Sequence, residues 1–75
     1  MTDPAGTTTA RVIANGEPIE ASLPCTLEQF IAGLGLPVRS VVVELNGEAI
    51  APSEFADRAL QTGDRLEIVQ MVGGG

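Results

Sequence analysis

The sequence predicts an α+β domain in which a mixed sheet of four to five strands packs against one helix and one short helical turn. Three observations support this prediction. Two Asn-Gly dipeptides each separate a pair of strand-like segments, a helix-like segment lies between the two pairs, and an apolar strand-like segment comes last. A chain of 75 residues has room for a single core, so all these elements are expected to share one domain.

The first pair of strands flanks Asn15 and Gly16 in the segment ARVIANGEPIEASL. This dipeptide favours a type I′ turn, because both residues accept the positive φ angles that the turn requires. A two-residue turn fixes the register and places Ile13 opposite Pro18, with the missing N–H of Pro18 on the side away from the first strand. Residues 17–23 are therefore predicted to form an edge strand. The inward-facing residues of this hairpin are Ala10, Val12, Ile19, Ala21 and Leu23.

A helix is predicted from about Thr26 to Leu34. Thr26 and Gln29 have the spacing of a capping box, and apolar residues follow at helical intervals. Gly35 can end the helix and Pro37 prevents its continuation. Cys25, directly before the helix, is expected to be a small buried hydrophobe; the nearby helix N-terminus could lower its pKa, but no neighbouring group would use the thiol. The apolar positions of the helix are Leu27, Phe30, Ile31 and Leu34.

The second half of the chain contains the remaining strands. Residues 41–43 are three valines that favour an interior strand, and Asn46-Gly47 predicts a second hairpin into a strand at 48–50. Residues 51–60 fit a short helical turn that closes over the core. The last strand, 65–72, is apolar on both sides and is expected to lie between the two hairpins. This arrangement is the ubiquitin-like β-grasp fold, predicted for residues 10–72 between a mobile leader at 1–9 and a flexible glycine tail at 73–75.

The composition excludes several functions. Ten acidic residues against four arginines give a net charge of −6, which disfavours nucleic acid and favours partners with basic surfaces. The chain has no histidine, no lysine and one cysteine, so neither a metal site nor a catalytic residue is expected. No apolar run approaches the roughly 18 residues of a membrane span, and no signal peptide is recognisable. We therefore expect a cytoplasmic binding protein without a bound cofactor, not an enzyme.

The alternation of residues along the final strand predicts a surface for partner binding. If Leu66 and Ile68 face the core, Val69 and Met71 lie on the opposite face, next to the glycine tail. Ordering the three glycines against another protein would cost roughly 1 to 2 kcal/mol per residue, which apolar contacts nearby would have to offset. We predict that Val69 and Met71 bind the partner and that Glu67 steers a basic surface towards them.

Four sequence features together resemble the ThiS family of sulfur carriers: the β-grasp pattern, the segment TGDRLEIV, the NGE that follows the central strand, and the terminal VGGG. The resemblance extends from Ala10 to Gly75. The small subunit of molybdopterin synthase and ubiquitin are more distantly similar. Membership of the ThiS family implies a reaction done to this protein by others, in which the carboxylate of Gly75 is the group that is modified.

The resemblance implies the following partners. A ThiF-like activating enzyme would use ATP and Mg to adenylate Gly75, and a persulfide-bearing sulfur donor would displace AMP. The resulting thiocarboxylate would deliver sulfur to a ThiG-like thiazole synthase for thiamine biosynthesis. Gly73 and Gly74 suit this chemistry because glycine leaves no bulk beside the reacting carbonyl. The alternatives are a sulfur carrier subunit of molybdopterin synthase, a ubiquitin-like protein modifier, and an interaction subunit with an idle tail.

Overall fold

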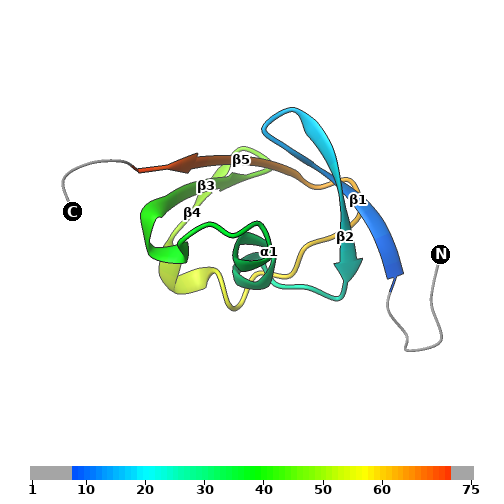
Figure 1. Cartoon of the computed structure of the whole chain (residues 1–75), viewed down its shortest axis with the longest axis horizontal. Helices are drawn as coiled ribbons and strands as arrows, with labels where there is room; N and C mark the ends of the chain where they lie inside the picture. The colour runs from blue at the N-terminus through cyan, green and yellow to red at the C-terminus, as the bar shows by residue number, and fades with distance from the viewer. Residues whose placement is uncertain (1–7, 72–75) are drawn as a thin grey trace.

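The computed structural model describes residues 8–71, which form one sheet of five strands, one α-helix and two short 3-10 turns. Figure 1 shows the α-helix and both 3-10 turns on the same side of the sheet. The elements, in chain order, are β1 (Thr8–Ala14), β2 (Glu17–Leu23), α1 (Leu27–Gly33), η1 (Val38–Ser40), β3 (Val41–Leu45), β4 (Glu48–Ile50), η2 (Pro52–Glu54) and β5 (Arg65–Gln70).

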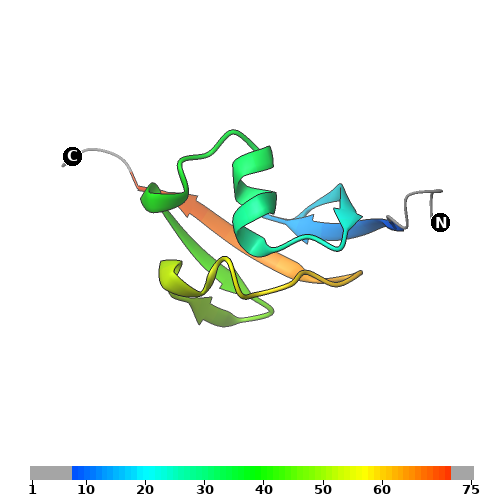
Figure 2. The ribbon, with the colours of Figure 1, turned by 90° about the horizontal axis from the view of Figure 1, so that it is seen from below.

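The strand order across the sheet is β2-β1-β5-β3-β4. β5 pairs in parallel with β1 and antiparallel with β3, while each hairpin is antiparallel, so the sheet is mixed. The predicted β-grasp fold is confirmed: β5 lies between the two hairpins, β3 is an interior strand, and β2 is an edge strand. Figure 2 shows α1 lying across one face of the sheet.

Both predicted Asn-Gly turns are present. Asn15 and Asn46 have φ angles of 51° and 52°, and the glycines that follow them have φ angles of 80° and 85°. These are the left-handed angles that a type I′ turn requires of its two central residues. The register of the first hairpin is also as predicted, with Ile13 opposite Pro18.

The first strand starts earlier than the sequence analysis placed it. β1 begins at Thr8, so Thr8 and Thr9 belong to the strand and not to the leader assigned to residues 1–9. Thr9 pairs with Ser22 of β2, which extends the hairpin ladder beyond its apolar part. The rest of the predicted leader, the last residue of the predicted domain and the glycine tail at 73–75 lie outside the described residues.

The helix has the predicted start and end. The backbone N–H of Gln29 donates to Thr26 Oγ1 at 3.1 Å, and the N–H of Thr26 donates to Gln29 Oε1 at 2.9 Å, which completes the capping box. At the other end Gly35 has a φ of 79°, and the N–H of Leu36 donates to the carbonyl of Ile31 at 3.3 Å. This is a Schellman ending, in which a glycine turns the chain away from the helix axis.

The core lies between the sheet and α1 and is closed by the segment that follows η2. Phe55 is fully buried and Leu60 is buried, whereas Ala59, also expected to close over the core, is exposed. Backbone bonds fix this segment to the start of α1, since the N–H of Glu28 donates to the carbonyl of Phe55 at 3.0 Å. The core cluster comprises Val12, Ala14, Ala21, Leu27, Phe30, Ile31, Val41, Val43, Leu45, Ile50, Phe55, Leu60, Leu66 and Ile68.

None of the helices within residues 8–71 is long and apolar enough to cross a membrane. The same residues contain no group of three or more His, Cys, Asp or Glu side chains placed to hold a metal ion.

Candidate functional site

The face of the sheet opposite α1 carries an apolar patch at the end of β5. Val69 and Met71 are 62% and 60% exposed, which confirms their predicted outward orientation. Val42 of β3 lies directly opposite Val69 and is 49% exposed. We call Val42, Val69 and Met71 the outer-face patch. Apolar surface gathered in this way is typical of an interaction site.

Met71 is held in place although β5 ends one residue before it. Its backbone N–H donates to the carbonyl of Ser40 at 2.6 Å. Because Ser40 directly precedes β3, this bond extends the pairing of β5 with β3 by one residue. The outer-face patch is therefore fixed up to the point at which the chain leaves the sheet, at the left of Figure 1. The tail residues Gly73, Gly74 and Gly75, which the sequence analysis singled out for modification, follow this point and lie outside the described residues.

Two carboxylates lie beside the outer-face patch. Glu67 is exposed on β5, and the register places Glu44 of β3 directly opposite it. Like charges in directly opposed positions destabilise a sheet, and no salt bridge within residues 8–71 involves either group. A cationic side chain from a partner would relieve this repulsion. The role predicted for Glu67 in steering a basic partner stays a prediction, now with Glu44 as a second participant.

Val42 and Glu44 were not among the site residues predicted from the sequence. The run of valines at 41–43 predicted an interior strand, but it did not indicate which of its side chains face outwards. The structure instead buries Val41 and Val43 and exposes Val42. The register of β3 against the last strand is what reveals both residues, since it places them beside Val69 and Glu67.

The turn asparagines position β5. Asn46 Oδ1 accepts from the N–H of Arg65 at 2.9 Å, and Asn46 Nδ2 donates to Asp64 Oδ1 at 3.0 Å. Asn15 contacts the backbone of Ile68 with both ends of its side-chain amide. β5 is thus bonded along its length by two side chains from the hairpin turns, as well as by the backbones of β1 and β3.

Cys25 has no features of a reactive site. Its thiol is partly buried and donates to the carbonyl of Thr26 at 3.2 Å. Burial raises the pKa of the Cys25 thiol, which is opposite to the effect that the nearby helix N-terminus could have had. A smaller thiolate fraction makes this cysteine a poor nucleophile, as expected, although its side chain is only partly buried and not buried as predicted.

Comparison with known proteins connects this fold to sulfur carriers. The sequence model of the ThiS family matches residues 7–75. The sulfur carrier protein ThiS of Thermus thermophilus is 38% identical over 63 residues, which are 81% of this chain and 94% of that protein. The crystal structure of a thiamine biosynthesis protein (ThiS) from Geobacter metallireducens superposes with a TM-score of 0.72 at 26% identity, over 87% of this chain and 99% of that one.

A second kind of relative is much longer. A thiazole synthase of Paramagnetospirillum magneticum is 40% identical over 65 residues, which are 87% of this chain but only 20% of that protein. This chain therefore spans about one fifth of the length of that relative. The family match covers nearly the whole sequence and agrees with the β-grasp topology and with a short relative matched over nearly its full length. The chain belongs to the ThiS family.

Proposed function

We propose that this protein is a sulfur carrier for thiamine biosynthesis and that sulfur is carried as a thiocarboxylate on Gly75. The observation that supports this most directly is the outer-face patch, an exposed apolar surface at the point where β5 leads towards the three terminal glycines. The similarity to the ThiS of Thermus thermophilus supports the same function. In this proposal the protein is a substrate of other enzymes and not itself a catalyst.

The proposed chemistry starts at the Gly75 carboxylate. A ThiF-like activating enzyme, using ATP and Mg, joins a carboxylate oxygen to the α-phosphate of ATP and releases pyrophosphate. The outer sulfur of a persulfide-bearing donor then attacks the acyl carbon, and AMP leaves. A thiol reductant cleaves the remaining S–S bond and leaves the thiocarboxylate on Gly75. ATP and Mg belong to the activating enzyme in this scheme, and this chain supplies only the carboxylate.

The residue types of the chain suit a carrier. Gly73, Gly74 and Gly75 place no side chain near the reacting carbonyl, so the tail can enter a narrow channel. The absence of lysine and histidine from the sequence leaves few groups that could attack the activated carboxyl. The raised pKa of the Cys25 thiol lowers its reactivity as a further competitor. Few side chains of this protein would therefore compete with the sulfur donor for an acyl adenylate on Gly75.

The outer-face patch is the proposed docking surface for both partners. Val42, Val69 and Met71 supply apolar area, and the opposed carboxylates of Glu44 and Glu67 favour a partner with basic groups at its rim. A ThiG-like thiazole synthase is the proposed sulfur acceptor. The match to one fifth of a thiazole synthase supports this choice, because that protein contains a region similar to this chain. The proposed location, with these partners, is the cytoplasm.

Intact-mass spectrometry tests the proposal. The protein is purified from cells that contain its native activating enzymes, and its mass is compared with that of the same protein made without them. We expect the first sample to be heavier by one oxygen-to-sulfur exchange, with the change located on Gly75. A variant that lacks Gly75 is the control and should show no change. Covalent attachment to lysines of other proteins would support a protein modifier instead, and an unmodified mass throughout would overturn the proposal.

A further inference from the structure

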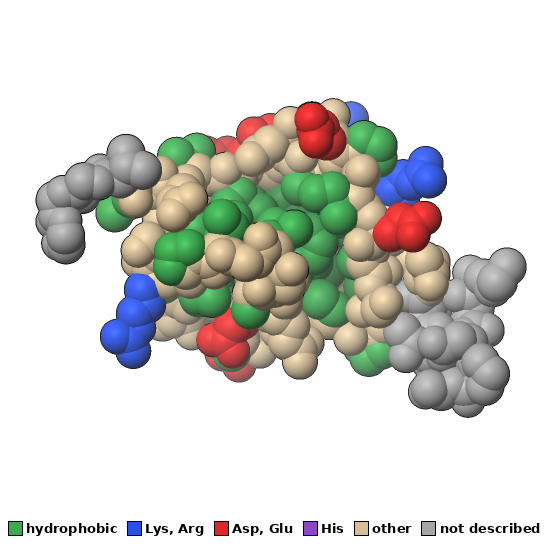
Figure 3. Space-filling view, viewed as in Figure 1, with side chains coloured by type: hydrophobic (Ala, Val, Ile, Leu, Met, Phe, Trp, Pro, Cys, Tyr) green, Lys and Arg blue, Asp and Glu red, His purple; other side chains and the backbone are tan. Residues whose placement is uncertain are grey.

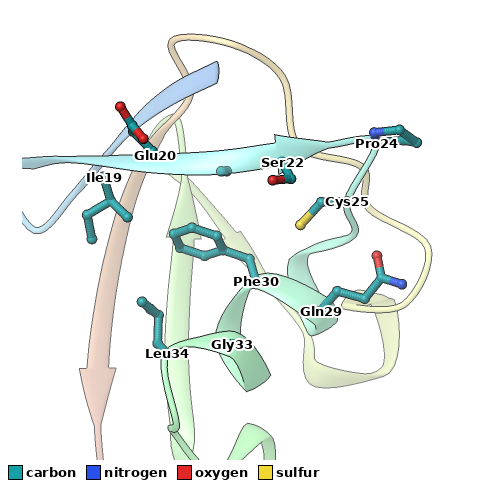
Figure 4. A pocket seen from close by; sticks show the side chains of 10 residues that line it. Ile19, Glu20, Ser22, Pro24, Cys25, Gln29, Phe30, Gly33 and Leu34 are labelled. Carbon is teal, nitrogen blue, oxygen red and sulfur yellow. The ribbon is translucent and has the colours of Figure 1, made fainter. Parts of the chain in front are cut away.

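A groove of about 350 Å³ lies between β2 and α1 and shares no residue with the outer-face patch. Figure 3 shows hydrophobic side chains gathered in the hollow between these two elements. In the close view of Figure 4, Ile19 of β2 points towards Phe30 of α1, and Leu34 at the end of the helix points into the same space. Leu34 is 39% exposed, so the apolar lining is open to a ligand.

The edge of the sheet beside the groove has free backbone groups. Along an antiparallel strand, every second residue directs its N–H and C=O towards the neighbouring strand and the residues between direct theirs away. In the observed register, the N–H and C=O of Glu20 and Ser22 point away from β1. The hydrogen bonds of β1 agree with this assignment. Arg11, which lies opposite Glu20, and Ile13 use their backbone groups on the side away from β2, where they bond to residues 63–64. Glu20 and Ser22 both line the groove. An extended chain could therefore pair with this edge while its side chains fill the groove.

Two prolines limit how this edge can pair. Pro18 lies near the start of β2 and Pro24 directly follows its end, and neither has an N–H to donate. The edge therefore donates only from Glu20 and Ser22. Two N–H donors are too few to support long, unselective strand pairing. They also fix the register of a short segment that pairs there.

Charge distinguishes between a second copy and a different partner. A second copy would bring the same acidic edge, with Glu17 and Glu20 on the strand, to a protein that already carries a net charge of −6. Figure 4 shows the Glu20 side chain on the face of β2 that points away from α1, although Glu20 also borders the groove. In an added strand, the residue opposite Glu20 shares that face, and the residues on either side of it face the groove. The complementary segment therefore has a cationic residue opposite Glu20 and an apolar residue on either side of it.

We propose that the β2 edge and its groove bind, by strand addition, an extended segment of a partner protein in which Lys or Arg alternates with branched apolar residues. The free N–H and C=O groups of Glu20 and Ser22 supply the backbone bonds. The groove beside Ile19, Phe30 and Leu34 accepts the apolar side chains, and Glu20 faces the cationic ones. This site is separate from the outer-face patch, so both surfaces could be occupied at once.

An NMR titration of the full ¹⁵N-labelled chain tests the proposal. The probe is a capped hexapeptide of alternating lysine and valine, and the control is a capped peptide of the same composition with three lysines followed by three valines. We expect the alternating peptide to shift the amide signals of Glu20 and Ser22, slow their hydrogen exchange, and bind more tightly than the block peptide. Equal binding of both peptides, shifts centred on Val69 and Met71, or no shifts at millimolar peptide would each overturn it.

Matched substitutions locate the contact. Glu20→Gln is expected to weaken binding roughly two- to fivefold, because a cross-strand ion pair is lost, whereas Glu44→Gln on the outer face removes the same charge and should have a smaller effect. Leu34→Ser should weaken binding, and Val42→Ser should not. The assigned site would be contradicted if the two glutamate variants weakened binding equally, or if Leu34→Ser and Val42→Ser did. The spectrum of each variant also reports whether it is folded. The titration does not involve Gly75, so its failure would leave the sulfur-carrier proposal intact.

Discussion

The side chain of Asn15 forms two hydrogen bonds with the backbone of Ile68, 53 residues later in the chain. Asn15 Nδ2 donates to the carbonyl of Ile68 at 3.0 Å, and the N–H of Ile68 donates to Asn15 Oδ1 at 2.7 Å. The amide thus pairs with β5 as a neighbouring strand would. Asn15 also has a φ of 51° in the turn between β1 and β2, so one residue both forms the hairpin and binds the last strand to it.

Replacing Asn15 by glycine separates these two roles. Glycine accepts the positive φ but has no side chain, so Asn15→Gly is expected to lower the free energy of unfolding by about 1 to 3 kcal/mol, the net value of two hydrogen bonds. Asn15→Asp retains the acceptor and loses the donor, and should fall between the parent and the glycine variant. Urea denaturation measures all three. A glycine variant as stable as the parent would show that the contacts with Ile68 contribute nothing.

The outer-face patch is expected to contribute to binding and not to folding. Val69→Ser removes apolar area from a side chain that is 62% exposed, so the unfolding free energy should change by no more than about 0.5 kcal/mol. Affinity for the activating enzyme should fall roughly tenfold, because burying a valine is worth about 1.5 kcal/mol or more. Calorimetric titration measures the affinity. Ala56→Ser, an exposed change outside both proposed binding surfaces, is the control and should bind as the parent does; equal losses in both variants would argue against this docking surface.

Phe55 is expected to be indispensable for stability. Its side chain is fully buried in the core, and its carbonyl accepts from the first turn of α1. Phe55→Ala should cost about 3 to 5 kcal/mol through lost burial and the cavity that remains. Because small domains have only about 5 to 15 kcal/mol in total, the midpoint of thermal unfolding should fall steeply. Ala59→Gly in the same segment, at an exposed position, is the control for changes in the loop itself. An alanine variant with an unchanged midpoint would contradict the assigned packing.

The thiol of Cys25 is expected to react slowly while the protein is folded. Burial raises its pKa, so near neutral pH a smaller fraction is thiolate than in the unfolded chain, and the rate should increase as the pH rises. Alkylation with iodoacetamide, followed by mass spectrometry, compares the native protein with the protein in urea. Faster alkylation of the native protein would mean that the thiol is activated and would reopen a chemical role for Cys25.

Local signals in the sequence were sufficient for most of the fold. Each Asn-Gly turn and the capping box of Thr26 and Gln29 depend on residues at most three positions apart, so they are readable without knowledge of the rest of the chain. The position of Pro18 was enough to identify the edge strand, because a missing N–H has the same consequence in any sheet. The short 3-10 turn at 38–40 was not predicted, since it carries no side-chain cap that would mark it.

The candidate surfaces required the tertiary structure. The alternation of Leu66 and Ile68 with charged residues was enough to predict that Val69 and Met71 face outwards. It could not place Val42 beside Val69, or Glu44 beside Glu67, because these pairs are formed by the register between β3 and β5, two strands more than twenty residues apart in the chain. The groove beside Leu34 likewise depends on how α1 lies against β2. Alternation along one strand is a local property, whereas the composition of a surface is decided by which strands become neighbours.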